Sequence, residues 1–309
     1  MSNRVFAALT AATLGWGLAA VGVRYAFEEG ASTFTVIGVR LGAAALAVSA
    51  FAALARRTSS AQEWRRGSLI GIPRIALGPI LFISSLQHIS AGVESILITL
   101  IPIATALMAW GFLDERLRRI QLVGFAIALT GAVVIISSGD SGLGAGEGNP
   151  LVGGLLAMGG VIAAAISGVL QRRFAPDHAT VPLAVPMFIT GGAVAFGFAL
   201  LFGDFDPGSL NGKLWALLIA LGLGSTLLPF VMTLYASKYT TAARVSLVAY
   251  VAPIISIMGG IVLLDEVLTG RIIVGGLMSL SGVFLAGSGA RKERAAPPIT
   301  AGAAGVAGD

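Results

Sequence analysis

SAGVESILITLIPIATALMAWGFLDERLRRIQLVGFAIALTGAVVI, residues 90–135, has a second copy in TAARVSLVAYVAPIISIMGGIVLLDEVLTGRIIVGGLMSLSGVFL, residues 241–285. A constant shift of 151 keeps the special residues in register, namely Pro102 with Pro253, Asp114-Glu115 with Asp265-Glu266, Gly124 with Gly275, Gly131 with Gly282, Ala91 with Ala242 and Ser95 with Ser246. In each copy an apolar run with a central proline reaches an Asp-Glu pair, and a second apolar run with two spaced glycines follows. The pattern predicts a helix pair that is duplicated within the chain.

Each copy resembles the EamA-type repeat of the drug/metabolite transporter superfamily. The shared features are a small residue before an apolar helix with a proline, an acid at the end of that helix, and a following helix with spaced glycines. The resemblance extends over nearly the whole chain. It implies two repeats of five helices and the transport of a small molecule, and it names no substrate.

The composition also predicts a membrane protein. Hydrophobic residues make up 56% and charged residues 11% of the 309 residues, and the mean hydropathy is +0.91. This composition leaves too little polar surface to coat a soluble globule. Without cysteines and with two histidines, the chain offers no disulfide framework, zinc site or haem site, so we expect no metal and no cofactor. Its basic residues lie in short clusters between apolar runs, a pattern of membrane topology rather than of nucleic-acid binding.

Ten apolar runs have the length needed to cross a hydrocarbon core of about 30 Å. They occupy residues 5–23, 34–55, 67–87, 90–112, 117–137, 150–171, 182–202, 213–236, 243–264 and 271–289. The expected fold class is therefore an all-α integral membrane protein with ten transmembrane helices. Residues 1–137 form the first five-helix repeat, the glycine-rich segment 138–149 a linker, residues 150–289 the second repeat and residues 290–309 a disordered tail.

The distribution of basic residues predicts the orientation of these helices. Fifteen lysines and arginines fall on the side of both termini and three on the other side, so we expect both termini in the cytoplasm of a bacterial cell, with the chain in the inner membrane. Because each repeat has an odd number of helices, the two repeats are expected to be inverted relative to each other. Inverted repeats are an architecture of alternating access, with a binding site near the midplane.

The third span carries the first candidate binding residues. Two prolines and two glycines within it predict a distorted helix, whose freed carbonyls need a protein-lined or wet cavity. Arg74 lies eight residues past Arg66, about 12 Å along a helix, and an arginine at that depth is a candidate for function. The alternatives are a side chain that reaches back to the interface, or a brace on helix-end carbonyls. The same face of the helix and its shifted copy add Gly78, Ser85, Ser225, Pro229 and Met232.

The fourth and ninth spans repeat a second candidate face. It consists of Ser95 and Thr99 beside Pro102, and of Ser246 and Tyr250 beside Pro253. Such hydroxyls line a polar path or bond back to their own helix, and we expect the second outcome for Ser95 and Ser246. We assign the ring of Tyr250 to the cavity.

Trp16 lies between two glycines near the middle of the first span, away from the interfaces where tryptophan is usual. A Trp-Gly pair is common at this place in the EamA-type repeats that the chain resembles. Trp16 is therefore a candidate for stacking on an aromatic or cationic substrate, and a packed indole is the alternative.

His88 and Glu94, at the start of the fourth span, are candidates for a proton relay, with wet positions at a loop edge as the plainer interpretation. Arg40 resembles an arginine common in the second helix of the family, and we interpret it as a brace. The two Asp-Glu pairs are expected to cap the following helix or to pair with nearby arginines.

The sequence therefore predicts a secondary transporter that exports a small metabolite by alternating access. One cation, several hydroxyls and aromatic rings suit a zwitterion, so amino acids with aromatic or other apolar side chains are the expected substrates, with Arg74 for the carboxylate. An exporter of drugs or lipophilic cations is the alternative. A membrane-embedded lipid enzyme would need paired acids or a histidine cluster, so we expect no catalytic residues. The expected partners are the substrate and membrane lipid, with no nucleic acid, and monomer and homodimer both remain open.

Overall fold

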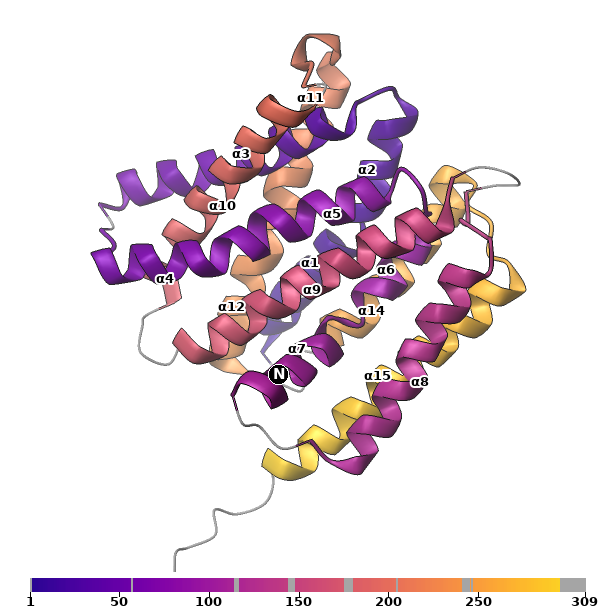
Figure 1. The fold of residues 1–309 in the computed structure, drawn as a ribbon. Coiled ribbons are helices and arrows are strands. Elements are labelled where there is room, and N and C mark those ends of the chain that lie inside the picture. The colour runs from indigo at the N-terminus through magenta and orange to yellow at the C-terminus, as the bar shows by residue number, and fades with distance from the viewer. Residues whose placement is uncertain are drawn as a thin grey trace, which may run out of the picture.

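The computed structural model describes residues 2–294 apart from 57, 114–116, 144–147, 175–179, 204, 241–244 and 246. Within these ranges the regular structure is entirely helical (Figure 1). In chain order the α-helices are α1 (Asn3–Gly17), α2 (Ala19–Glu28), α3 (Thr33–Leu54), α4 (Ala61–Gly71), α5 (Gly78–Ser85), α6 (Ala91–Ile98), α7 (Ile101–Phe112), α8 (Arg119–Ser137), α9 (Pro150–Phe174), α10 (Thr180–Phe202), α11 (Gly212–Leu221), α12 (Leu228–Tyr239), α14 (Leu247–Leu264) and α15 (Gly270–Arg294).

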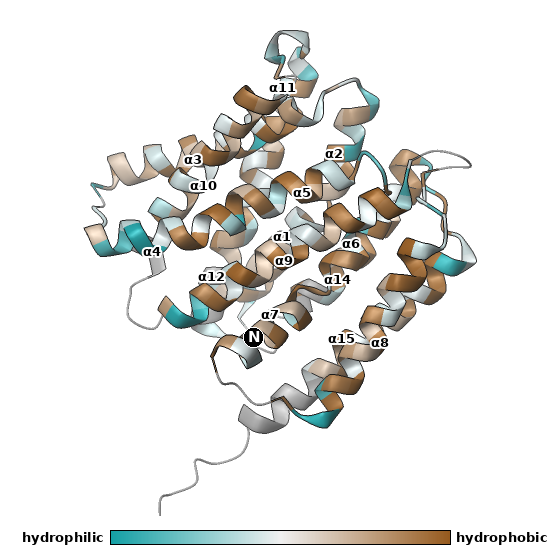
Figure 2. Ribbon diagram, viewed as in Figure 1, coloured by the Kyte–Doolittle hydropathy of each residue, from teal (hydrophilic) through white to brown (hydrophobic). Residues whose placement is uncertain are grey.

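These helices build the predicted membrane spans. In the described part of the chain, nine helical stretches are long and apolar enough to cross a membrane, and the shorter apolar helix Tyr250–Leu264 stands where the remaining span is expected. Figure 2 shows apolar residues along the helices and hydrophilic ones mostly near their ends. The all-helical membrane fold predicted from the composition is thus confirmed.

Several spans consist of two helices because the sequence interrupts them. The first span breaks at Leu18, and the fourth breaks at Thr99 and Leu100, just before Pro102. The third and eighth spans contain π-helical turns, η1 (Ile72–Leu77) and η4 (Gly222–Leu227), at corresponding places in the two halves. The distortion that the prolines and glycines predict in the third span takes this form, since a proline cannot donate to the regular helical ladder.

Among the described helices, the most extensive contact between the two halves joins α8 to α15, the last span of each half. A Cβ added at Gly124 would lie 2.6 Å from the carbonyl oxygen of Gly282, and one at Gly131 would lie 2.5 Å from that of Gly275. Because Gly124 corresponds to Gly275 and Gly131 to Gly282, the two pairs exchange partners. This exchange is the pattern of a two-fold contact. Small residues let the backbones approach this closely.

Other contacts between the halves also occur in corresponding pairs. Helix α1 packs on α12 while α5 packs on α9, and α1 packs on α14 while α7 packs on α9. Likewise α3 contacts η4 while α10 contacts η1. In each pair, the two contacts are equivalent: replacing each span of the first contact by its counterpart in the other half gives the second contact. The space enclosed by these spans is therefore walled by both halves.

Candidate functional site

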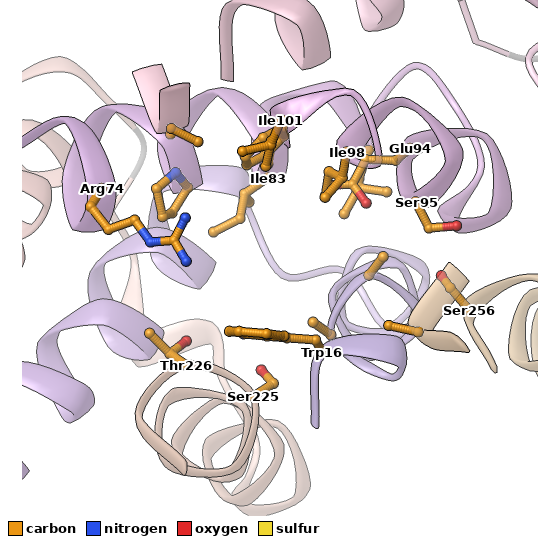
Figure 3. Close-up of a pocket in the computed structure, with 18 of the residues that line it drawn as sticks. Trp16, Arg74, Ile83, Glu94, Ser95, Ile98, Ile101, Ser225, Thr226 and Ser256 are labelled. Atoms are coloured by element: carbon orange, nitrogen blue, oxygen red, sulfur yellow. The ribbon is translucent and has the colours of Figure 1, made fainter. Parts of the chain in front are cut away.

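A cavity of about 330 Å³ lies between the two halves (Figure 3). Its volume is within the range of small-molecule sites. The lining is largely apolar and includes Ile75, Phe82, Ile98, Phe188 and Phe230. The groups that give it polarity are Trp16, Arg40, Arg74, Glu94, Ser95, Thr99, Ser225, Thr226 and Ser256.

Arg74 projects into this cavity from the π-helical turn η1 (Figure 3). It directly follows Pro73 at the start of that turn. Its guanidinium forms no hydrogen bond or ion pair with any residue that the structure describes. A cation placed in a mostly apolar cavity without a protein partner is suited to bind an anionic group of a ligand.

Glu94 lies in the first turn of α6 and faces the same cavity (Figure 3). It is only 3% exposed, so the interpretation of Glu94 as a wet residue at a loop edge is wrong. Ser90 caps α6 at the end of the bundle. Glu94 lies one turn further along the helix, where its side chain faces the interior. Its carboxylate has no hydrogen-bonding partner among the described residues. The cavity therefore holds an acid that the sequence interpretation named for a proton relay rather than for substrate binding.

Arg40 connects the first half to the second and also lines the cavity. Its guanidinium donates to Ser225 Oγ at 3.1 Å and to Thr226 Oγ1 at 3.2 Å, both in η4. The brace interpreted from the sequence is therefore present, but it lies in the wall of the site. In the sequence, Arg40 and Arg74 look alike, because each lies about one third of the way along its predicted span. Only the fold shows that Arg40 has hydroxyl partners.

The two glycines beside Trp16 let the first span pack closely on the second half. A Cβ at Gly15 would collide with the carbonyl oxygen of Gly224, and one at Gly17 would lie 2.7 Å from Ile255 Cβ. Between them the indole extends into the cavity below Arg74 in the view of Figure 3. The Gly-Trp-Gly pattern thus combines close helix packing with a ring in the site.

Three predicted hydroxyl residues line the cavity while bonding to their own helices. Ser95 donates to Gly92 O at 2.8 Å, Thr99 to Ile96 O at 2.6 Å and Ser225 to Leu221 O at 2.6 Å. The bond that we expected Ser95 to make to its own helix is therefore present. Because the hydrogen of each hydroxyl is engaged, these groups face a ligand mainly as acceptors. Gly78 also lines the cavity.

Other predicted site residues lie elsewhere. Ser85 is fully buried and donates to Phe82 O at 2.7 Å. Pro229 packs against the position of Gly15, and Met232 packs against a cluster that includes Val5 and Leu9. These positions share a helical face with Arg74 or its copy, but the π-helical turns rotate the following residues away from it.

Tyr250 and His88 also lie outside the cavity lining. The ring of Tyr250 packs edge-on against Phe284 of α15, with centroids 6.4 Å apart, so its assignment to the cavity is wrong. His88 is half-buried in the loop before α6 and packs near Gly153. Ser246 falls outside the described residues, so its assignment stays a prediction.

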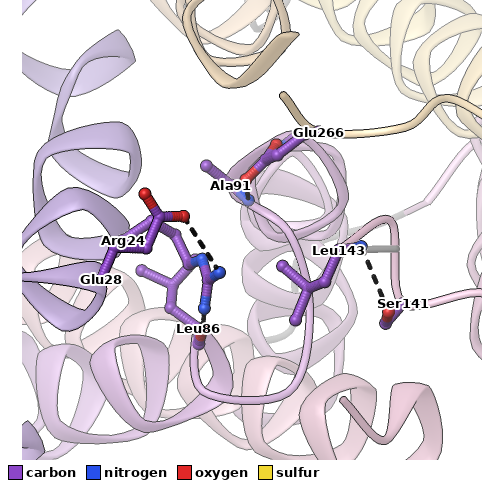
Figure 4. Close-up of polar contacts among 8 residues, drawn as sticks. Arg24, Glu28, Leu86, Ala91, Ser141, Leu143 and Glu266 are labelled. Atoms are coloured by element: carbon purple, nitrogen blue, oxygen red, sulfur yellow. Dashed lines mark hydrogen bonds and ion pairs between the residues drawn. The ribbon is translucent and has the colours of Figure 1, made fainter. Parts of the chain in front are cut away.

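The acid of the second Asp-Glu pair contacts a different helix from the one expected. Glu266 accepts hydrogen bonds from the N–H groups of Ala91 and Gly92 at the start of α6 (Figure 4). Its expected roles, as cap of the following helix or partner of Arg271, are therefore wrong, and Arg271 donates instead to Ser138 O at 2.8 Å. Asp114 and Glu115 lie outside the described residues.

A protein-family model connects this cavity to known proteins. The model of the EamA-like transporter family matches residues 4–137 and again residues 151–288. A solved crystal structure, 20% identical in sequence, superposes with a TM-score of 0.62 over 95% of this chain and 99% of its own, which shows a shared fold.

Relatives from several organisms match along most of the chain. An uncharacterized transporter of Archaeoglobus fulgidus is 25% identical over 87% of this chain and 94% of its own length. A probable terminal-alkyne amino-acid exporter of Streptantibioticus cattleyicolor is 26% identical over 94% and 96%. The uncharacterized inner membrane transporter YedA of Escherichia coli is 25% identical over 86% of this chain and 84% of its own length.

Proposed function

Because the family model matches both halves, the chain belongs to the EamA-like transporter family, and we propose that it exports amino acids with apolar, above all aromatic, side chains. As a member of this family it is a multi-pass membrane transporter within the drug/metabolite transporter superfamily. The substrate, the direction and the mechanism that follow are the proposed part.

The observation that carries the proposal is the pair of opposite charges in one apolar cavity. Arg74 and Glu94 both line it, and neither has a hydrogen-bonding partner among the residues that the structure describes. A zwitterion brings one group of each sign, so we propose that its carboxylate faces Arg74 and its ammonium faces Glu94. The ring of Trp16 and the apolar walls suit a hydrophobic or aromatic side chain. The amino-acid exporter among the relatives supports the same substrate class.

Alternating access is the proposed mechanism. The corresponding contacts of the two halves support a pair of inverted repeats, and the cavity lies between those halves as such a mechanism requires. The inner membrane relative supports the same location for this chain. Both termini are placed in the cytoplasm on the strength of the basic residues that surround them.

Export of lipophilic cations is the second candidate, and Glu94 is the observation that favours it. A buried carboxylate with no hydrogen-bonding partner among the described residues would attract a cationic drug. However, Arg40 and Arg74 line the same cavity, so the two positive charges outnumber the single acid. This balance favours a substrate that brings its own carboxylate.

Transport by the purified protein in lipid vesicles tests the proposal. Phenylalanine, tryptophan and leucine are compared with their methyl esters, which lack the carboxylate, and with a lipophilic cation, each with and without a proton gradient. We expect the protein to accelerate efflux of the free amino acids over protein-free vesicles, and by a larger factor than it accelerates efflux of the esters, which also cross lipid unaided as neutral amines. Protein-dependent movement of the lipophilic cation and the esters, but not of the amino acids, would instead establish the second candidate.

A further inference from the structure

The loops 86–90 and 265–269 and residues 138–143 of the linker meet at one end of the bundle, here called the linker end. There Glu266 of the second half accepts hydrogen bonds from Ala91 N at 2.7 Å and Gly92 N at 3.1 Å in the first half (Figure 4). Ser90 Oγ accepts from Val93 N at 3.1 Å. Together these two side chains occupy the N–H groups of the first turn of α6, where a carboxylate is also stabilised by the helix dipole.

The turn that carries Glu266 is shaped to deliver its carboxylate to the other half. Asp265 has a φ of +49°, in the left-handed region that aspartate tolerates better than most residues. Glu266 N donates to Gly260 O at 3.1 Å, which fixes the backbone. A Cβ at Gly260 would collide with the Glu266 carboxylate, so the position of this carboxylate depends on a glycine.

The contact lies directly beyond the cavity. Glu94 and Ser95, one turn further along α6, line the cavity. Ser256 of α14 also lines it and donates to Ala91 O at 3.1 Å. On the neighbouring loop, Leu86 lines it too, and Leu86 O accepts from Arg24 at 3.0 Å. The Ser256 bond joins the two halves at this end of the cavity, and the Arg24 bond joins two spans of the first half there.

The linker reinforces the same region. Ser141 O accepts from Ser90 N at 2.9 Å, and Gly142 O accepts from Val267 N at 3.0 Å. The linker thereby bridges the loop before α6 and the loop that carries Glu266. It holds these two loops side by side.

The buried Glu266 carboxylate carries a desolvation cost that opposes the gain from its hydrogen bonds. Burial raises the pKa of Glu266 above its ordinary value, although the N–H groups of Ala91 and Gly92 and the charge of Arg24 act to lower it. Burial therefore offsets much of what the hydrogen bonds gain. When the halves separate, water can hydrate the carboxylate and both N–H groups, so none stays unsatisfied.

We infer that the contact between Glu266 and the first turn of α6 is a releasable latch that closes the cavity at the linker end. The inference rests on the proposed alternating access, in which the cavity opens to the two membrane faces in turn. It assigns to the acid at the end of the ninth span a role in conformational exchange between the halves. Weakening the latch should therefore populate the state that is open at the linker end.

Cysteine labelling tests the latch without knowledge of the substrate. The chain has no native cysteine, so Ile98→Cys places a single thiol in the cavity lining of α6. A membrane-impermeant maleimide is added at the linker end, and the labelling rate is measured per folded molecule. Glu266→Gln removes the negative charge. Gly260→Ala retains the charge but displaces the carboxylate from the N–H groups of α6. Asp265→Asn is the matched control, because Asp265 is exposed and asparagine also tolerates its left-handed backbone.

We expect about ten-fold faster labelling from the linker end in both Glu266→Gln and Gly260→Ala, the size expected for a lost charge-assisted hydrogen bond. Asp265→Asn should leave the rate unchanged. If both latch variants label at the original rate, or if Asp265→Asn accelerates labelling equally, Glu266 is not the latch. Because labelling needs no substrate, a correct result here together with failed amino-acid transport would overturn the proposed substrate and leave the latch standing.

Discussion

Arg74 is the residue on which the proposed recognition of a carboxylate depends. Because its guanidinium has no protein partner among the described residues, Arg74→Ala should leave folding nearly intact and weaken amino-acid binding about ten- to a hundred-fold. Arg74→Lys should restore only part of the affinity, since an ammonium lacks the bidentate geometry of arginine. Binding is measured per folded molecule, with the exposed Arg65→Ala on the same span as the control. An unchanged dissociation constant for Arg74→Ala would remove this residue from the site.

Glu94 should recognise the substrate's ammonium group. Glu94→Gln keeps the shape of the side chain and removes its charge, so transport of a free amino acid should fall by about ten-fold or more. An N-acetylated amino acid lacks the ammonium and should bind the variant as well as, or better than, the original protein. Competition assays with the two ligands measure this difference. Equal losses for both ligands would show that Glu94 supports the fold rather than the ammonium.

The sequence identified Arg74 and Trp16 because their residue types are unusual at the middle of a span. It misplaced Glu94 because distance along the chain from a loop does not reveal which way a side chain faces. The prediction for Tyr250 was wrong for a related reason. Its side chain faces α15, and no pattern within one span indicates which helix lies beside it. Residue type and depth were readable, whereas direction depended on how the spans pack.

At the scale of elements, the glycines of α8 and α15 hold the two halves together. Gly282→Ala would place a Cβ 2.5 Å from both Gly124 O and Ala128 N, so we expect a loss of about 1–3 kcal/mol of stability from overpacking. In contrast, Gly197→Ala meets no atom within 4 Å and should be neutral or slightly stabilising. Thermal unfolding in detergent compares the two variants. Equal stability would show that this contact does not need small residues.

Helix positions followed closely from hydropathy, since the observed spans differ from the predicted runs mainly at their ends. The first span is longer than expected, reaching Glu28 rather than residue 23, because polar residues extend a helix beyond its apolar stretch. The prolines and glycines predicted a distorted third span. They did not predict a π-helical turn. The π-helical turns of the two halves explain why Ser85, Pro229 and Met232 point away from the cavity.

For the whole molecule, the basic residues predict the orientation in the membrane. A reporter fused after Gly142 should lie outside the cell, and one fused after Arg294 should lie inside. Enzymatic reporters that are active on one side only provide the measurement. If both fusions report the same side, an even number of spans separates them and the ten-helix topology is wrong.

The correspondence between the contacts of the two halves was readable from the duplicated sequence, because the same special residues recur at a constant shift. The contact of Glu266 with the first half was not readable from the sequence. Glu266 and Ala91 are 175 residues apart in the chain, and the duplication relates each to its own copy rather than to the other. Only the packing of the spans brings them together.

Alternating access through the central cavity is tested most directly by a single cysteine at Ala252, which lines that cavity on α14. Vesicles of both orientations are treated with a membrane-impermeant thiol reagent, with and without saturating phenylalanine. The account predicts that the thiol reacts from both membrane faces and that phenylalanine slows both reactions. Reaction from one face alone, or rates that phenylalanine leaves unchanged, would contradict it.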